Sequence, residues 1–168
     1  MMISQSTVIN GYRAKGKRYS KVRGHTGIDL NYKTGNELIA PVTGEVLATP
    51  VQKEMGNCLY VRDTQGAIHV FAHLESVRVQ KYDKVKRGDV IAITGNTGTG
   101  TSGEHLHYEI MTVKPYHLVP DAIMYRKELL FKGYNTEPVT YLKDLYKKYH
   151  IDWLTGKSLN PEVPPYSF

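Results

Sequence analysis

The sequence has one cysteine and no long apolar run, and these two absences limit the class of protein that it encodes. Cys58 has no second cysteine with which to form an intrachain disulfide, so packing must supply most of the stability. No apolar run approaches the roughly 20 residues that cross a bilayer as a helix, so we expect no membrane span. The first 24 residues contain no apolar core segment, so we expect no secretory signal peptide among them.

Two catalytic motifs are also missing. The glycine- and threonine-rich stretch 94–103 lacks the G-x-x-x-x-G-K-[ST] pattern of a phosphate loop and precedes a strand, so we expect a loop at the edge of a groove. Cys58 lies in the strand-like GNCLYVRD, which favours a buried packing role. A cysteine protease would instead need the thiol to be exposed beside a base.

The charge balance is basic. Lysine and arginine exceed aspartate and glutamate by 22 to 16, which gives a net charge of +6 and attraction to polyanions. Basic residues gather in the first two dozen positions and again at Lys143, Lys147 and Lys148. Neither group contains a helix-turn-helix, zinc-finger or aromatic stacking motif, so we expect solvated surface charge and no nucleic-acid partner.

Histidines and one aspartate form two short motifs, GHTGIDL (24–30) and GEHLHYEI (103–110), with His73 in VFAHL between them. His25 and Asp29 are four apart, and His105 and His107 are two apart, so an extended strand would aim each pair to one side. Flanking glycines allow the backbone to approach a site closely. Three imidazole and carboxylate donors suit Zn²⁺, and a further histidine suits proton transfer. The pattern predicts a metal-dependent hydrolase.

The order of further motifs extends this pattern over about residues 10 to 111. It reads GYR, HTGIDL, IAPVTGEVLA, GNCLYVRD, HVFAHLESVRV and VKRGDVIAITGNTGTGTSGEHLHYEI. This order resembles the lysostaphin-like, or LytM-type, zinc endopeptidases, which cut peptide cross-links in bacterial peptidoglycan. The resemblance implies that His25, Asp29 and His107 bind one catalytic Zn²⁺. It also implies that His73 and His105 are the catalytic histidines.

Those implied roles fit the chemistry of a zinc hydrolase. Three protein ligands leave a position on zinc for water, whose pKa falls from near 16 toward about 7. His73 and His105 would share two duties, accepting the proton of the attacking water and stabilising the oxyanion or protonating the leaving amine. Some family members are non-catalytic regulators, but this chain keeps all five positions.

The expected substrate lies outside the cytoplasm. Without a signal peptide, either export elements lie outside this sequence or the protein reaches the wall by another route, as a phage lysin or virion component would. The alternatives to an endopeptidase are a non-catalytic wall-binding or regulatory relative and a virion structural protein. Glycine bridges and D-alanyl–diaminopimelate bonds both suit this active site.

Two other residues, Tyr19 and His69, are weaker candidates. Some relatives carry a substrate-contacting tyrosine near the position of Tyr19, but coincidence explains it as well. His69 could share the face of His73 in a strand, and we expect a pocket-wall or surface position. His117 and His150 fall outside the resemblance and are expected to be structural or exposed.

The first part of the chain, residues 1–112, is expected to be a mainly β catalytic domain. Runs rich in Val, Ile and Tyr alternate with glycine and Asx turns, which predicts an antiparallel sheet, and the resemblance implies that this sheet lines a groove. The predicted strands are 37–48, 58–63, 67–74, 77–80, 89–94 and 105–111.

Residues 113–168 are expected to form a C-terminal extension with one or two helices. Asp121 could cap a helix over 122–131, and Thr136 with Pro138 could open another over 139–151. In the second, Val139, Leu142, Leu145, Tyr146 and Tyr149 recur at helical spacing. The proline-rich end is expected to be extended, and the extension could dock on a larger phage assembly.

Overall fold

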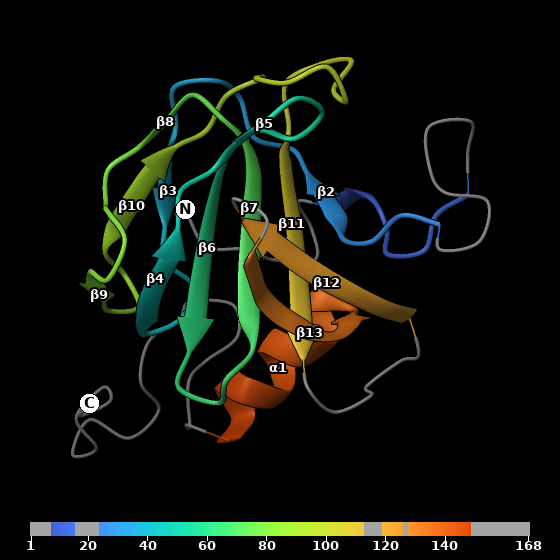
Figure 1. The fold of residues 1–168 in the computed structure, drawn as a ribbon. Coiled ribbons are helices and arrows are strands. Elements are labelled where there is room, and N and C mark those ends of the chain that lie inside the picture. The colour runs from blue at the N-terminus through green and yellow to red at the C-terminus, as the bar shows by residue number, and fades with distance from the viewer. Residues whose placement is uncertain (1–7, 16–23, 113–118, 126–127, 149–168) are drawn as a thin grey trace.

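The computed structural model describes residues 8–15, 24–112, 119–125 and 128–148, and these residues are mainly β (Figure 1). The strands are β1 (Val8–Asn10), β2 (Ile28–Leu30), β3 (Glu37–Ile39), β4 (Gly44–Ala48), β5 (Val51–Gln52), β6 (Gly56–Asp63), β7 (Ile68–Leu74), β8 (Ser76–Val77), β9 (Lys84–Val85), β10 (Val90–Ile93), β11 (Leu106–Thr112), β12 (Val119–Tyr125) and β13 (Glu128–Thr136). The helix of the described part is α1 (Pro138–Lys148), which has 11 residues. No helix in the same residues has the length and apolar character that a bilayer crossing requires.

The strands of the described residues form two sheets, and both are antiparallel, as the sequence predicted. The larger sheet has ten strands and runs β1-β2-β11-β7-β6-β4-β9, while β5 extends β6 and the hairpin β12–β13 joins the edge of β11. The smaller sheet runs β3-β10-β8. β11 pairs with three strands of the larger sheet, with β7 along one edge and with both β2 and β13 along the other.

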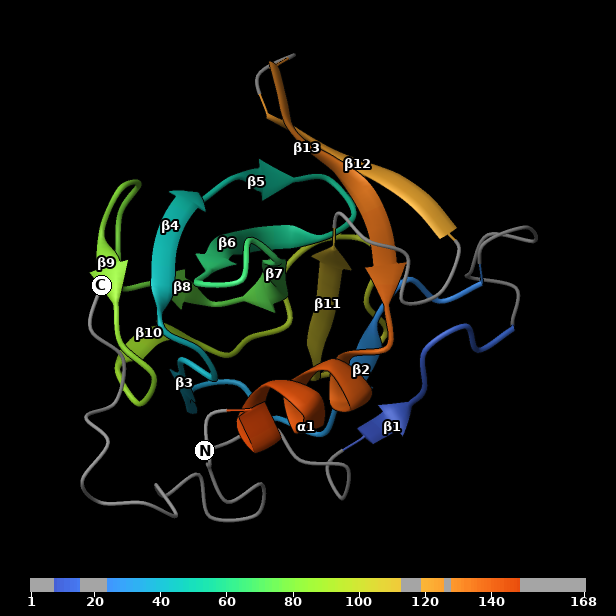
Figure 2. The ribbon, with the colours of Figure 1, turned by 90° about the horizontal axis from the view of Figure 1, so that it is seen from below.

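The two faces of β11 have different environments. Tyr108 and Ile110 point into the main core, where they are packed with side chains from α1 and from the smaller sheet. Met111 belongs to a second apolar cluster, formed with residues of β4, β6 and β7. Figure 2 shows α1 lying along the side of the curved sheet where β3 and β2 lie. His107 and Glu109 alternate with Tyr108 and so lie on the face away from α1.

Residues 37–48, predicted as one strand, contain two separate strands, β3 and β4. β3 pairs with β10 in the smaller sheet, whereas β4 pairs with β6 and β9 in the larger sheet. Pro41 lies between them and offers no backbone donor, so a continuous ladder cannot pass through this position.

The prediction of a helix over 122–131 is wrong. The described residues of this range, 122–125 and 128–131, belong to β12 and β13, which pair as antiparallel strands. Thr136, Asn135 and Tyr134 of β13 pair with Ile110, Met111 and Thr112, so the hairpin extends the main sheet beside β2. By pairing with β11, β13 gives hydrogen-bond partners to backbone N–H and C=O groups at the edge of that strand. This tertiary pairing outweighs the local helix propensity of the segment.

The second predicted helix is confirmed. Pro138 occupies its first turn, and the Glu137 carboxylate caps it by accepting from the backbone N–H groups of Val139 (3.1 Å) and Thr140 (2.7 Å). Thr136, the expected opening residue, instead ends β13. The predicted apolar face is buried at Val139, Leu142, Leu145 and Tyr146, and Tyr149 lies outside the described residues.

A buried polar network joins α1 to the sheet. Asp63 Oδ2 accepts from His69 Nε2 (3.1 Å) and from the Tyr141 hydroxyl (2.6 Å), and Asp63 Oδ1 accepts from the backbone N–H of Ala67 (2.9 Å). The Tyr108 hydroxyl then lies 2.6 Å from His69 Nδ1. Burial raises the pKa of Asp63, but the hydrogen bonds from His69 and Tyr141 outweigh burial and lower the pKa overall.

We expect Asp63→Asn to destabilise the protein in a pH-dependent way. Because the pKa of Asp63 is depressed in the folded state, its contribution is present above the ordinary value of 3.8 and is lost as pH falls through the folded value. Urea unfolding near pH 7 should show a loss of about 2–3 kcal/mol, and the difference from wild type should shrink below about pH 4. Asp144→Asn, on the exposed face of α1, is the control. Equal stability of Asp63→Asn and wild type at neutral pH would contradict this assignment.

Candidate metal centre and catalytic histidines

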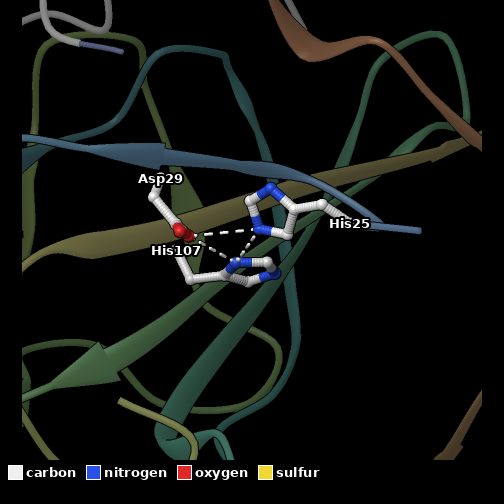
Figure 3. Close-up of side chains that lie close together, drawn as sticks. All are labelled: His25, Asp29 and His107. Atoms are coloured by element: carbon white, nitrogen blue, oxygen red, sulfur yellow. Dashed lines mark hydrogen bonds and ion pairs between the residues drawn. The ribbon is translucent and has the colours of Figure 1, made fainter. Parts of the chain in front are cut away.

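Three side chains, His25, Asp29 and His107, converge on one point and form what we call the His–Asp–His cluster (Figure 3). Asp29 Oδ1 lies 3.0 Å from His107 Nδ1 and 3.2 Å from His25 Nε2. The two imidazole nitrogens are 3.0 Å apart, and all three ligand atoms lie within 4.8 Å of one another. All three residues are buried.

Strand pairing places two of these residues side by side. Asp29 of β2 is in register with His107 of β11, and their neighbours Ile28 and Leu30 point into the main core. Asp29 therefore faces the same side of the sheet as His107. His25 lies before β2 rather than in an extended strand, so its position depends on a close approach at Gly27. A Cβ at Gly27 would overlap the backbone carbonyl of Tyr108, so only glycine lets this segment lie against β11.

Each member of the cluster has a second partner that orients it. His25 Nδ1 donates to the Gly11 carbonyl (3.0 Å), and this leaves the Nε2 lone pair for the cluster. His107 Nε2 donates to Glu109 Oε1 (2.8 Å), and this leaves the Nδ1 lone pair. Asp29 Oδ2 accepts from the Asn10 amide (2.9 Å), and Oδ1 faces the two rings.

The geometry requires a positive charge among the three ligand atoms. With these tautomers, two nitrogen lone pairs and a carboxylate oxygen would face one another at about van der Waals contact or less, which is repulsive unless a proton or a cation lies between them. Burial lowers the pKa of His107, but hydrogen bonds with Asp29 and Glu109 outweigh burial and raise it to about 9. Burial likewise raises the pKa of Asp29, but hydrogen bonds from His107 and His25 lower it overall.

The donor set fits a divalent transition metal. Two imidazole nitrogens and one carboxylate oxygen are ligands that Zn²⁺ prefers, and three protein ligands leave a coordination position for water or substrate. Gly11 and Glu109 orient the two histidines in the way expected at a metal site. Metal-binding histidines commonly donate their second ring N–H to a carbonyl or a carboxylate.

The two other motif histidines lie beside this cluster. The His73 and His105 ring centroids are 4.7 Å apart, and His105 Nε2 is 3.5 Å from Asp29 Oδ1. His73 Nδ1 donates to the Thr97 carbonyl (2.9 Å), and His105 Nδ1 donates to the Gly103 carbonyl (2.8 Å), so Nε2 of each ring is the proton-accepting atom. Burial lowers the pKa of His73, which favours its neutral form.

A β-bulge turns His73 toward the His–Asp–His cluster. In β7, Phe71 packs on Tyr108 in the core, and strict alternation would send His73 to the same side. Between the pairs Asn57↔Leu74 and Leu59↔Phe71 the register shifts, and His73 has a φ of 61°. The extra residue and the left-handed backbone reverse the alternation, so the ring lies beside His105 and His107 instead.

The remaining candidates fall elsewhere. His69 does not share the face of His73, because it is fully buried on the core side with Asp63, so the expected pocket-wall or surface position is wrong. Cys58 is buried, as expected, and burial raises the pKa of its thiol to about 12. Tyr19, His117 and His150 lie outside the described residues.

Sequence reasoning missed the residues that orient the ligands, namely Asn10, Gly11 and Glu109. Glu109 could have been found, because H-x-H-x-E at positions 105, 107 and 109 places all three side chains on one face of a strand. Asn10 and Gly11 carried no comparable signal, because their contact with the cluster depends on the pairing of β1 with β2.

Comparison with known proteins gives the class of this molecule. The profile of Peptidase family M23 matches residues 23–118, and the chain belongs to this family. The lysostaphin-like resemblance expected from the sequence is thereby confirmed. The solved structure of LytU is 26% identical, with a TM-score of 0.64 over 84% of this chain and 88% of LytU.

Curated relatives include proteins with two different roles. ShyA of Vibrio cholerae, a peptidoglycan DD-endopeptidase, is 33% identical over 54% of this chain. NlpD of Escherichia coli, a murein hydrolase activator, is 31% identical over 58% of this chain. The chain covers 21% of ShyA and 26% of NlpD, so it spans a minor part of these relatives.

We expect Glu109→Gln to weaken metal binding by about 10-fold or more, because loss of the negative charge weakens the hydrogen bond that orients His107 and its basicity as a ligand. Competition for Zn²⁺ against a chromophoric chelator measures this change. Glu37→Gln, at an exposed position of β3, should bind as tightly as wild type. Unchanged affinity in Glu109→Gln would contradict the role of Glu109.

Proposed function

We propose that this protein is a zinc-dependent endopeptidase that hydrolyses peptide cross-links of bacterial peptidoglycan. The observation that carries the proposal is the convergence of His25, Asp29 and His107 within 4.8 Å, with a second pair of histidines beside them. Family M23 membership supports it, because all five motif positions are filled by residues able to bind a metal or move a proton.

In this proposal the five residues divide into ligands and proton carriers. His25 Nε2, Asp29 Oδ1 and His107 Nδ1 hold Zn²⁺, and His73 and His105 do not bind it. When bound, Zn²⁺ polarises the scissile carbonyl and makes a water molecule acidic enough to act near neutral pH. The Nε2 atoms of His73 and His105 then share two tasks: accepting the proton of the attacking water, and stabilising the oxyanion or returning a proton to the leaving amine.

The substrate class rests on chemistry and on the relatives. ShyA is named a peptidoglycan DD-endopeptidase, and we extend its substrate class to this chain. The net charge of +6 favours approach to the anionic polymers of the wall. A protein that acts on peptidoglycan in this way would be extracellular or periplasmic. Association with a phage particle stays a prediction, which a search for the chain in purified virions would test.

Purified cell walls test the activity. We expect release of soluble peptides from peptidoglycan that stops when a chelator removes the metal and returns when Zn²⁺ is restored. Walls with glycine bridges and walls with direct D-alanyl–diaminopimelate cross-links, digested in parallel, identify the bond that is cut. No release from either wall by zinc-loaded protein would favour a non-catalytic role, such as that of the activator NlpD.

Single substitutions separate the proposed roles. His73→Ala and His105→Ala should each retain one Zn²⁺ per chain but lose at least about 100-fold in cleavage rate, because they remove a general acid–base group. Asp29→Ala should lose the metal and the activity together. Elemental analysis of the purified proteins measures zinc, and Asp144→Asn serves as the active control. Full activity in His105→Ala, or full zinc occupancy in Asp29→Ala, would refute the assignment.

A further inference from the structure

The segment before the matched family region lies directly against the His–Asp–His cluster. The family match begins at residue 23, but β1 already pairs with β2, with Asn10 in register with Asp29. After β1 the chain stays attached, because the Arg13 N–H donates to the His25 carbonyl (2.7 Å) and the His25 N–H donates to the Ala14 carbonyl (3.0 Å). Residues 8–15 thus follow the ligand-bearing segment along its length.

Two residues of this segment touch metal ligands through hydrogen bonds of good length. The Asn10 amide donates to Asp29 Oδ2 (2.9 Å), and the Gly11 carbonyl accepts from His25 Nδ1 (3.0 Å). A turn holds the Gly11 carbonyl in place, since the same oxygen accepts from the Ala14 N–H (3.2 Å). Two of the three ligands are therefore oriented from outside the matched region.

β13, which lies beyond the matched region, also contacts this segment. The Tyr12 hydroxyl donates to the backbone carbonyl of Asn135 in β13 (2.9 Å), a residue beyond the end of the match at 118. Burial raises the pKa of Tyr12, so the hydroxyl keeps its proton and can donate. Asn135 is fully buried, and its side-chain amide lies 3.5 Å from Glu109 Oε2, a long contact to the carboxylate that orients His107.

The orientation of the Asn135 amide is set by this carboxylate. Asn135 Oδ1 has no hydrogen-bond partner in the described part of the chain. Flipping the amide would bring that oxygen toward Glu109 and place two acceptors together, so the nitrogen faces the carboxylate. A buried amide with an unpaired oxygen is unfavourable on stability grounds alone, and its position beside Glu109 indicates a role at the metal centre.

We propose that Asn10, Gly11, Tyr12 and Asn135 are positioning residues of the metal centre, so that the two segments flanking the family region help to set its metal affinity. Asn10 and Gly11 orient Asp29 and His25 directly. Tyr12 ties that segment to β13, and Asn135 supports Glu109 behind His107. The proposal rests on the proposed function only in taking the cluster to be a zinc site.

The test compares Zn²⁺ affinity in full-length variants. Metal-free protein is titrated with Zn²⁺ against a chromophoric chelator for wild type, Asn10→Ala and Tyr12→Phe. Loss of a partner behind a metal ligand weakens binding by about 10–100-fold, so we expect about 10-fold for Asn10→Ala and a smaller but measurable loss for Tyr12→Phe. Asn36→Ala and Tyr82→Phe are matched controls, because Asn36 donates to the Lys33 carbonyl and Tyr82 is exposed.

Two further measurements separate positioning from folding. Urea unfolding of the metal-free proteins shows whether each variant folds as stably as wild type. The visible spectrum of bound Co²⁺ reports ligand geometry, and it should change in Asn10→Ala but not in Asn36→Ala. Wild-type affinity and an unchanged Co²⁺ spectrum in both Asn10→Ala and Tyr12→Phe would overturn the proposal. If wild type itself bound no Zn²⁺, the proposed zinc enzyme would fail and this inference with it.

Discussion

The pairing of β11 with its neighbours is the constraint on which both the core and the site depend. β11 hydrogen-bonds to β7 along one edge and to β2 and β13 along the other. Its side chains alternate, so that Tyr108 and Ile110 fill the main core, while His107 and Glu109 lie on the other face with the His–Asp–His cluster. A shift of one residue in register would exchange the two sets and bury the histidine and the carboxylate in the apolar core. The packing of the core therefore holds the His–Asp–His cluster in place.

Regular strands place only part of the site, and local irregularities place the rest. Asp29 and His107 follow from the pairing of β2 with β11. His25 is brought in because Gly27 permits close contact with β11, and His73 is turned by a bulge with a φ of 61°. The left-handed backbone at His73 is unfavourable locally and persists because the surrounding sheet holds it. The close approach at Gly27 and the bulge at His73 each bring a motif histidine to the same face.

Some elements of the fold could be predicted from the sequence and others could not, and the difference has physical reasons. Helix α1 was predictable because its cap, its first-turn proline and its apolar spacing are local signals. The hairpin β12–β13 was mispredicted as a helix because its conformation is decided by the edge of β11, which is distant in sequence. The strand over 37–48 was too long because its two halves pair in different sheets. His69 was misplaced because alternation along β7 is interrupted before His73.

The sequence by itself determined the residue types of the site, their grouping into short motifs, and a mainly β fold, because these follow from local spacing and from family resemblance. Only the tertiary structure decided which atoms meet. Nε2 of His25 and Nδ1 of His107 lie 3.0 Å apart although 82 positions separate the two residues. Asn10 reaches Asp29 only because β1 pairs with β2. Orientation of a ring depends on hydrogen bonds to distant backbone and side-chain atoms, and spacing along one chain carries no information about those partners.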